Sequence, residues 1–200
     1  MASSVEIANM ALSHLGTGKE IASFTENSAE ANACRRFYDT ALEKTLRGSN
    51  WPFATRFQTL NLIEINPNEE WSYGYRYPTD CLQAIRIVSG IKNEAKQDRI
   101  DYRIVNQLTG PEIYTMKENA ILEYTVSVTD VNLFPSDFKM ALSFLLAHYA
   151  APRVTKGDPF GMGKRAMESY FLEISDAKAN AYNEEQPADL PQSEFVRTRE

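Results

Sequence analysis

The residues with the greatest potential for chemistry are two adjacent carboxylates, Glu69 and Glu70. Two carboxylates are sufficient to cleave a glycosidic bond, one as the acid and the other as base or nucleophile. Four aromatic residues, whose faces could stack on sugars, follow the pair: Trp71, Tyr73, Tyr75 and Tyr77. Exposed acids beside half-buried tyrosines at a sheet edge would give the same pattern, and surface acids are far commoner than catalytic pairs. A cell-wall (peptidoglycan) hydrolase is therefore the alternative prediction.

The other reactive residue types lack the spacing that their chemistry needs. His14 and His148 belong to no ligand pair of the HExxH kind. The glycines and lysines of residues 156–164 do not match the phosphate loop GxxxxGK[ST], and no strand is expected before them. Cys34 and Cys81 are too few for a disulfide framework or a metal cluster, and we expect two buried small hydrophobes in a reducing compartment. We predict no catalytic residue, no cofactor and no metal site, and a protein that is not an enzyme.

The composition is that of an ordinary globular chain. Its 200 residues, 43% hydrophobic and 24% charged, are enough for one core, or for one core with a smaller subdomain. No apolar run approaches the roughly 18 residues that a membrane span needs, so we expect no membrane anchor. The N-terminus has no basic region and does not fit a secretory signal.

The net charge of −6 argues against tight binding of nucleic acid. No segment is basic enough to neutralise a row of phosphates. Half of the net charge lies in residues 183–200, which hold two basic and five acidic residues. A surface past which DNA slides without sticking is still compatible with this balance, because like charges repel.

The clearest element is a helix that begins near Asn27 and ends at Gly48. Asn27 is the expected N-cap, with Glu30 as the second half of a capping box. Small and apolar residues recur at helical spacing along one stripe: Ala31, Cys34, Tyr38, Ala41 and Thr45. Pro52 cannot continue the helix. The sequence therefore predicts a helix that runs into an aromatic hinge, Trp51-Pro52-Phe53.

The remaining pattern predicts two helical hairpins with strands between them in sequence. A first helix is expected to be capped by Ser3 or Ser4 and to end at Gly16. We expect it to form a hairpin with the second helix, in which the apolar stripes of the two helices face each other. Alternating or apolar runs predict strands at residues 55–65, 71–77, 81–88, 102–105, 113–116 and 120–128. Helical periodicity returns at residues 135–151 and 159–182.

These elements predict an α+β fold with three parts. Residues 1–53 and 130–182 form an antiparallel helical bundle of two hairpins, and residues 54–129 form an inserted antiparallel β-sandwich or barrel-like subdomain. Residues 183–200 form an extended C-terminal tail, because its prolines oppose regular structure and its acids favour solvation. Phe195 and Val196 are the apolar residues there that could anchor the tail to a partner.

The order of these motifs resembles a known family, the head-to-tail adaptors of tailed bacteriophages, specifically the tail tubular protein A group of short-tailed phages. The resemblance is carried by residues 8–16 (ANMALSHLG) with Ile21, 28–36 (SAEANACRR), Leu46-Arg47, Trp51-Pro52-Phe53 and 77–82 (YPTDCL). It extends over residues 1–180 in the arrangement of elements and is specific mainly in 8–53 and 77–88. None of these motifs is catalytic, so the resemblance supplies no active-site residues.

The resemblance implies a structural virion protein, made in the host cytoplasm. Members of the family look like twelvefold rings that join the portal to the tail nozzle (the tail tube protein) and extend the channel for the genomic DNA, without sequence-specific binding. We expect the tail to contact the portal through Phe195, Val196, Arg197 and Arg199, and the tips of the β insertion to contact the nozzle. A third possibility is a cytoplasmic binding module unrelated to phage, which would be a stable monomer.

Overall fold

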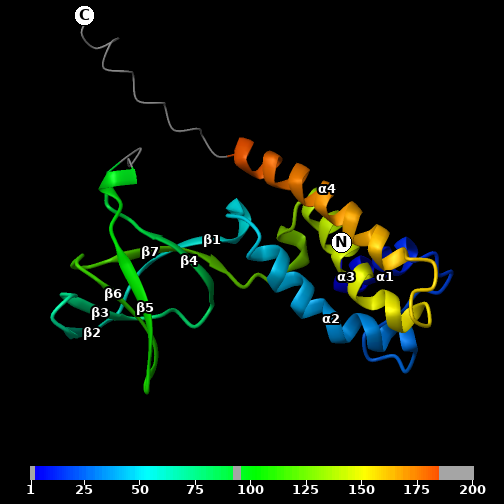
Figure 1. The fold of residues 1–200 in the computed structure, drawn as a ribbon, viewed down its shortest axis with the longest axis horizontal. Helices are drawn as coiled ribbons and strands as arrows, with labels where there is room; N and C mark the ends of the chain where they lie inside the picture. The colour runs from blue at the N-terminus through cyan, green and yellow to red at the C-terminus, as the bar shows by residue number, and fades with distance from the viewer. Residues whose placement is uncertain (1–2, 92–95, 185–200) are drawn as a thin grey trace, which may run out of the picture. The chain divides into compact units, whose positions relative to one another are not determined.

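Helices flank the strands along the described part of the chain (Figure 1). The computed structural model describes residues 3–91 and 96–184. In these residues there are four α-helices: α1 (Ser4–His14), α2 (Ala29–Leu46), α3 (Ser136–Val154) and α4 (Met162–Glu184). Seven strands lie between α2 and α3 in sequence: β1 (Thr55–Thr59), β2 (Leu62–Ile65), β3 (Tyr73–Arg76), β4 (Cys81–Ile87), β5 (Tyr102–Gln107), β6 (Gly110–Thr115) and β7 (Ile121–Val126). The predicted α+β class is confirmed.

The chain divides into two compact units. The first, the helical unit, comprises the residues up to Arg56 together with Thr79–Ile85 and Tyr124–Tyr182. The second, the β unit, comprises Phe57–Pro78 and Arg86–Glu123 among the described residues. The boundaries expected from the sequence, at residues 53, 129 and 182, stay predictions, and most of the expected tail lies outside the described residues.

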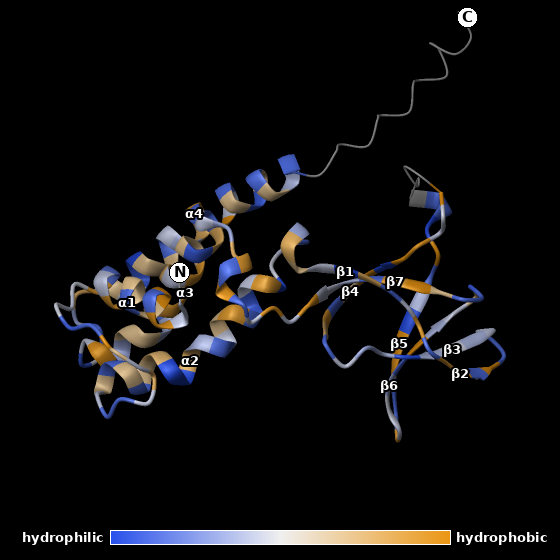
Figure 2. Cartoon of the chain, turned by 180° about the vertical axis from the view of Figure 1, so that it is seen from behind, coloured by the Kyte–Doolittle hydropathy of each residue, from blue (hydrophilic) through white to orange (hydrophobic). Residues whose placement is uncertain are grey.

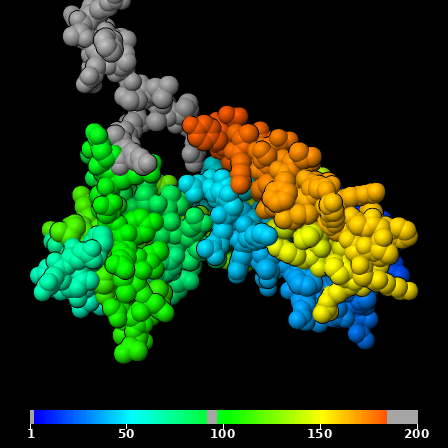
Figure 3. Space-filling view, viewed as in Figure 1, coloured from blue at the N-terminus to red at the C-terminus, as the bar shows by residue number. Residues whose placement is uncertain are grey.

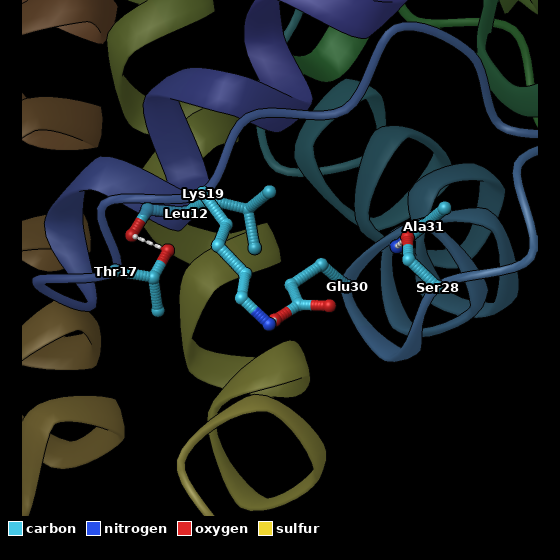
Figure 4. Close-up of polar contacts among 6 residues, drawn as sticks. All are labelled: Leu12, Thr17, Lys19, Ser28, Glu30 and Ala31. Carbon is cyan, nitrogen blue, oxygen red and sulfur yellow. Dashed lines mark hydrogen bonds and ion pairs between the residues drawn. The ribbon is translucent and has the colours of Figure 1, made fainter.

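Polar contacts fix both ends of the loop between α1 and α2 (Figure 4). Ser3 caps α1 in a full capping box with Glu6. After the helix, Gly16 takes a left-handed conformation (φ 70°) and the Thr17 hydroxyl donates to the Leu12 carbonyl oxygen at 3.0 Å. Lys19 forms an ion pair with Glu30 of α2, with 3.4 Å between Nζ and Oε1. The loop is thereby tied to both helices.

The predicted N-cap of α2 is wrong by one residue. Ser28, not Asn27, is the cap, and its side chain accepts a hydrogen bond from the Ala31 N–H at 3.1 Å (Figure 4). The shift moves Glu30 from the third helical position to the second. A capping box needs its acid at the third position, so Glu30 does not complete one and forms an ion pair with Lys19 instead.

Helix α3 is the central element of the helical unit, because α1 and α2 both pack mainly against it and only slightly against each other. The predicted pairing of the first two stripes is therefore largely replaced by packing on α3. Nine residues of α3 are buried: Phe138, Ala141, Leu142, Ser143, Leu145, Leu146, Ala147, Ala150 and Ala151. The helix also continues through Pro152, where the sequence predicted its end, and closes where Thr155 donates twice to the Ala151 carbonyl oxygen.

The strands form two antiparallel sheets, one in the order β1-β7-β4 and the other in the order β2-β3-β6-β5. The single strand predicted at residues 55–65 is in fact two, β1 and β2, which belong to different sheets. The break lies at two adjacent residues, since the Leu60 N–H donates to the Ala120 carbonyl oxygen whereas the Asn61 carbonyl oxygen accepts from the Arg76 N–H, both at 2.9 Å. Within the described residues neither sheet closes on itself, so the barrel form of the prediction is not observed there.

Hydrophobic residues line the strands as well as the helices (Figure 2). In the helical unit the apolar faces of the helices are buried, for example at Tyr170, Ile174 and Ala177 of α4. In the β unit the fully buried side chains are few, and the largest are Tyr75, Ile87, Ile113 and Leu122. The two units therefore differ in how completely they cover their own apolar surface.

Candidate interaction surface

Of the predicted hinge, Trp51 lies in the core of the helical unit, whereas Pro52 and Phe53 are half-buried. The Trp51 side chain is 1% exposed, and its indole N–H donates to the Thr45 carbonyl oxygen at 3.0 Å. The Trp51 ring packs edge-on against the Phe138 ring, with centroids 5.1 Å apart. The Phe53 ring also packs against Phe138, with centroids 5.0 Å apart. Pro52 opens a short 3-10 turn, Pro52–Ala54. These contacts fix the direction in which the chain leaves α2.

The turn motif at residues 77–82 also has a structural role. Asp80 forms an ion pair with Arg56 and accepts a hydrogen bond from the Tyr124 hydroxyl at 3.0 Å. Burial and the bond to Asp80 raise the pKa of Tyr124. The Asp80 carbonyl oxygen also accepts from the Ser127 N–H at 3.1 Å. The aspartate thus joins β1, β4 and β7 where they lie in the helical unit.

The four residues expected to contact the portal, Phe195, Val196, Arg197 and Arg199, lie outside the described residues.

The candidate carboxylates lie in the loop between β2 and β3. An Asx turn shapes this loop, because the Asn68 side-chain oxygen accepts from the N–H groups of Glu70 and Trp71, both at 2.9 Å. The loop lines a hollow of about 570 Å³ together with Met116. Glu69 and Glu70 are both exposed, and Glu70 lies 3.8 Å from the guanidinium of Arg103.

This arrangement lacks the environment that general acid catalysis uses. An acid that must keep its proton near neutral pH is usually buried in apolar surroundings, whereas Glu69 and Glu70 face water. The aromatic platform is also incomplete, because Tyr75 is 2% exposed, donates its hydroxyl hydrogen to the Lys117 carbonyl oxygen and stacks beneath Tyr73. The Trp71 indole N–H is buried and has no hydrogen-bond partner among the residues that the structure describes.

A serine and a histidine meet in the helical unit, and no sequence pattern predicted this because they are 129 positions apart. The His14 Nε2 atom lies 2.9 Å from the Ser143 hydroxyl, and the imidazole stacks on Phe144. Ser143 is fully buried and donates its hydrogen to the Met140 carbonyl oxygen at 2.7 Å. In the tautomer protonated at Nε2 the histidine donates to the serine, which is the wrong direction for a general base. The pair stabilises the packing of α1 on α3, and burial lowers the pKa of His14.

Of the two cysteines expected to be buried, Cys34 is buried and Cys81 is half-buried. Cys34 is buried in α2, and burial, with a smaller effect of the Glu30 carboxylate, raises the pKa of its thiol to about 11. Such a thiol is a poor nucleophile at neutral pH. Within residues 3–91 and 96–184, no cluster of histidine, cysteine and acidic side chains could hold a metal ion.

Exposed apolar side chains are concentrated in the β unit. Fourteen large hydrophobic residues are exposed in the described part of the chain, and nine of them belong to this unit: Phe57, Leu62, Ile63, Ile65, Ile91, Ile104, Leu108, Met116 and Ile121. Leu108 is fully exposed at the turn between β5 and β6, which projects as a green tip from the β unit (Figure 3). Contiguous exposed apolar surface marks sites of protein–protein contact.

Several of these residues lie on the two edge strands of the four-stranded sheet. Every residue of β2 is exposed, including Leu62 (50%) and Ile65 (64%). On the opposite edge, β5 exposes Ile104 (48%). In the described residues β2 pairs only with β3, and β5 only with β6. Edge strands with exposed apolar side chains are templates for pairing with another chain.

No family model matches this chain, and no curated protein matches it. None of the described helices is both long and apolar enough to cross a membrane.

Proposed function

We propose that this chain is a head-to-tail adaptor of a tailed phage, a structural protein and not an enzyme. It assembles as a ring, which we expect to be a dodecamer, that joins the portal to the tail nozzle and extends the channel through which the genome leaves. The four helices form one antiparallel bundle that supports the ring. The β unit forms an inserted sandwich-like subdomain, and residues 183–200 form an extended tail.

The observation that carries the proposal is the apolar surface of the β unit. Nine large hydrophobic side chains are exposed on a unit with a small core of its own. Exposed apolar side chains mark a site of protein–protein contact where they form a contiguous patch, and we interpret those of the β unit in this way. A ring subunit needs two different contact faces, because head-to-tail contacts must close. The helical unit and the β unit offer faces of different composition for this purpose.

The sequence resemblance is the reason that we assign this apolar surface to the contacts of a head-to-tail adaptor. Trp51 and Asp80, which belong to the motifs that carry the resemblance, are both engaged in structural contacts. An adaptor motif is expected to hold the fold rather than to react. The exposed tip of the β5–β6 hairpin, with Leu108 at its end, fits the contact that we expect with the nozzle.

The proposal is tested by the mass of the protein in solution, measured by light scattering. The chain is measured alone and after mixing with the purified portal ring of the phage that encodes it. We expect a complex with one adaptor per portal subunit. Deletion of residues 185–200 should abolish this complex but leave the far-UV circular dichroism of the helices unchanged.

Point variants make the test specific. Phe195→Ser should weaken portal binding, whereas the control Leu172→Ser, on the exposed side of α4, should not. A chain that stays monomeric at every concentration and ignores the portal ring contradicts the adaptor proposal and favours a cytoplasmic binding module.

A second candidate, a peptidoglycan hydrolase, is favoured by one observation. The unpartnered indole N–H of Trp71 and the carboxylates of Glu69 and Glu70 belong to the same hollow. Purified peptidoglycan is the substrate to test, with release of soluble fragments as the readout. Loss of turnover in Glu69→Gln or Glu70→Gln, but not in the control Glu118→Gln, would establish this activity.

A further inference from the structure

We propose that neighbouring copies of this chain join through the edges of the four-stranded sheet. The outer edge of β2 in one copy pairs antiparallel with the outer edge of β5 in the next, so that one sheet continues from copy to copy. This inference deepens the proposed function, since it rests on the ring and names one of the contacts that build it.

The directions of the strands permit this pairing without any rearrangement. Each neighbouring pair in the order β2-β3-β6-β5 is antiparallel. Three antiparallel steps separate the two edges, so β2 and β5 run in opposite directions. A neighbouring copy in a similar orientation therefore presents its β5 antiparallel to β2, with the two sheet faces matched. A three- or five-stranded sheet would present parallel edges instead.

The register of the sheet brings complementary side chains together. One cross-strand row runs Glu64, Gly74, Tyr114, Arg103, so that it begins with an acid and ends with a base. When the row continues into the next copy, Glu64 comes to lie opposite Arg103 of that copy. Oppositely charged residues that lie opposite each other stabilise an antiparallel pair.

The two adjacent rows lie on the other face of the sheet and end in apolar residues. One row runs from Leu62 on β2 to Ile104 on β5, and the other from Ile65 to Tyr102. Leu62, Ile65 and Ile104 are each about half exposed or more in the single chain. Continuation of the sheet places Leu62 against Ile104 of the next copy. Apolar residues then meet apolar residues on one face, while Glu64 meets Arg103 on the other.

Pairing of β2 with another β2 is disfavoured by charge. The charged residue of β2 is Glu64, and the loop that follows adds Glu69 and Glu70. Two such edges would bring acids together, and like charges opposite each other destabilise a sheet. The ion pair of Arg103 with Glu70 in its own chain is 3.8 Å long and two-thirds exposed on both sides. Such a pair contributes little, so the guanidinium can turn to Glu64 of a neighbour.

The contact is short, and we expect one pair alone to be weak. A β-bulge at Ile63 interrupts the regular pairing of β2, which limits the matched stretch to Leu62, Glu64 and Ile65. An area this small falls below that of a stable interface. Closure of the ring adds the remaining contacts within one assembly, which raises the effective concentration of each edge.

Cysteine cross-linking detects such a contact even when it is transient. Residues opposite each other in an antiparallel pair have Cα atoms about 4.5–5.5 Å apart, which suits a disulfide. Chains with Glu64→Cys and chains with Arg103→Cys, distinguished by tags of different length, are mixed under mild oxidation with copper phenanthroline. We expect mixed dimers to form at least about tenfold faster than either homodimer, because pairing raises the local thiol concentration. A chain that carries both cysteines should give a ladder of oligomers.

The controls separate this pairing from chance collisions. Asp176→Cys on the exposed side of α4 measures the collision rate, and each variant mixed with the unchanged chain accounts for Cys34 and Cys81. Charge reversal provides a second test without cysteines. Glu64→Arg and Arg103→Glu should each raise the dissociation constant of the contact about tenfold, and the double variant should restore it.

Homodimers of either single-cysteine chain as the main product, or mixed dimers that form no faster than with Asp176→Cys, would overturn the pairing. A ring that binds the portal without these cross-links would do the same but leave the adaptor proposal intact. A cross-linked ladder from a chain that ignores the portal would support the pairing and count against the adaptor.

Discussion

The helical unit and the β unit differ in how much of their apolar surface they bury. Of the 39 buried hydrophobic residues in the described part of the chain, 32 lie in the helical unit, Trp51 and Phe138 among them. Among the fourteen large hydrophobic residues that are exposed, nine lie in the β unit, although that unit is much smaller. The helical unit covers its own core. The β unit leaves part of its apolar surface for another chain to cover.

The difference follows from the two kinds of element. A helix satisfies its backbone internally and needs only to bury one stripe, as α1 and α2 do against α3. A small open sheet always has two edges with unsatisfied backbone groups, here β2 and β5. Assembly is therefore expected to change the β unit most and the helical core least.

The two tryptophans test this contrast directly, because each unit contains one. Trp51→Ala removes a ring that is 1% exposed and should lower the free energy of unfolding by about 3–5 kcal/mol. Trp71→Ala removes a half-buried ring whose N–H has no partner in the described part of the chain. It should cost about 1 kcal/mol or less, since an unsatisfied buried donor disappears with it. Urea denaturation followed by far-UV circular dichroism measures both.

The remaining tryptophan in each variant serves as a local reporter. Fluorescence of the Trp51→Phe chain follows the β unit, and that of the Trp71→Phe chain follows the helical unit. Equal losses of stability in the two alanine variants would contradict the contrast between a self-sufficient unit and one that needs a partner.

The element types could be predicted from the sequence, but their pairing could not. Helical periodicity predicted all four helices of the described residues, and alternation predicted most strands. The same alternation runs without a break from Thr55 to Ile65, because it records which face is apolar and not which sheet the strand joins. The switch between sheets at Leu60 depends on Ala120, sixty residues away. Asn27 and Ser28 are both good caps, so local propensity could not choose between them.

The candidate interaction surface at the edges of the four-stranded sheet was harder to predict from the sequence than the elements themselves. Glu64 and Arg103 stand at the two ends of one row only because β3 pairs with β6, and that pairing joins residues about forty positions apart. The carboxylates of Glu69 and Glu70 were candidates because of their residue type, but only the fold shows that both are exposed. Contacts between distant residues create both the surface and the buried His14–Ser143 pair.

The packing of α3 on α4 offers the next test of the helical core. A Cβ atom at Gly163 would lie 2.8 Å from the Ala151 Cβ and 2.9 Å from an Asp158 carboxylate oxygen. Gly163→Ala should therefore lower the unfolding free energy by about 1–3 kcal/mol, as overpacking does. Gly18→Ala, where nothing lies within 4 Å and φ is not left-handed, should be neutral or slightly stabilising. Thermal unfolding measures both, and a neutral Gly163→Ala would show that α4 can move away from α3.

The start of α2 provides a smaller test with a neighbouring control. Ser28→Ala removes the hydrogen bond to the Ala31 N–H and should cost about 1 kcal/mol. Asn27→Ala leaves this bond in place and should change stability by less than about 0.5 kcal/mol. The reverse ranking in urea denaturation would restore Asn27 as the cap.

The smallest effect we predict is a dependence of the helical unit on pH through His14. Burial lowers the pKa of this histidine below its usual 6.5, so near that pH the unfolded chain binds more protons than the folded one, and stability rises with pH. The stabilisation is complete above pH 6.5 and is lost as the pH falls below it. We expect a loss of less than about 1 kcal/mol, because the ring is half-buried and solvent screens its charge.

Replacement of the histidine isolates this contribution. His14→Gln removes the titrating ring, so the difference in unfolding free energy between it and the unchanged chain should shrink from pH 7.5 to pH 5.5. His148→Gln is the matched control on α3, and it should retain the slope that His14 supplies. Because His14 joins α1 to α3, the loss should be detected by the fluorescence of Trp51 and not by that of Trp71. An equal response of both tryptophans would mean that the two units unfold together, and that the helical unit is not independent of the β unit.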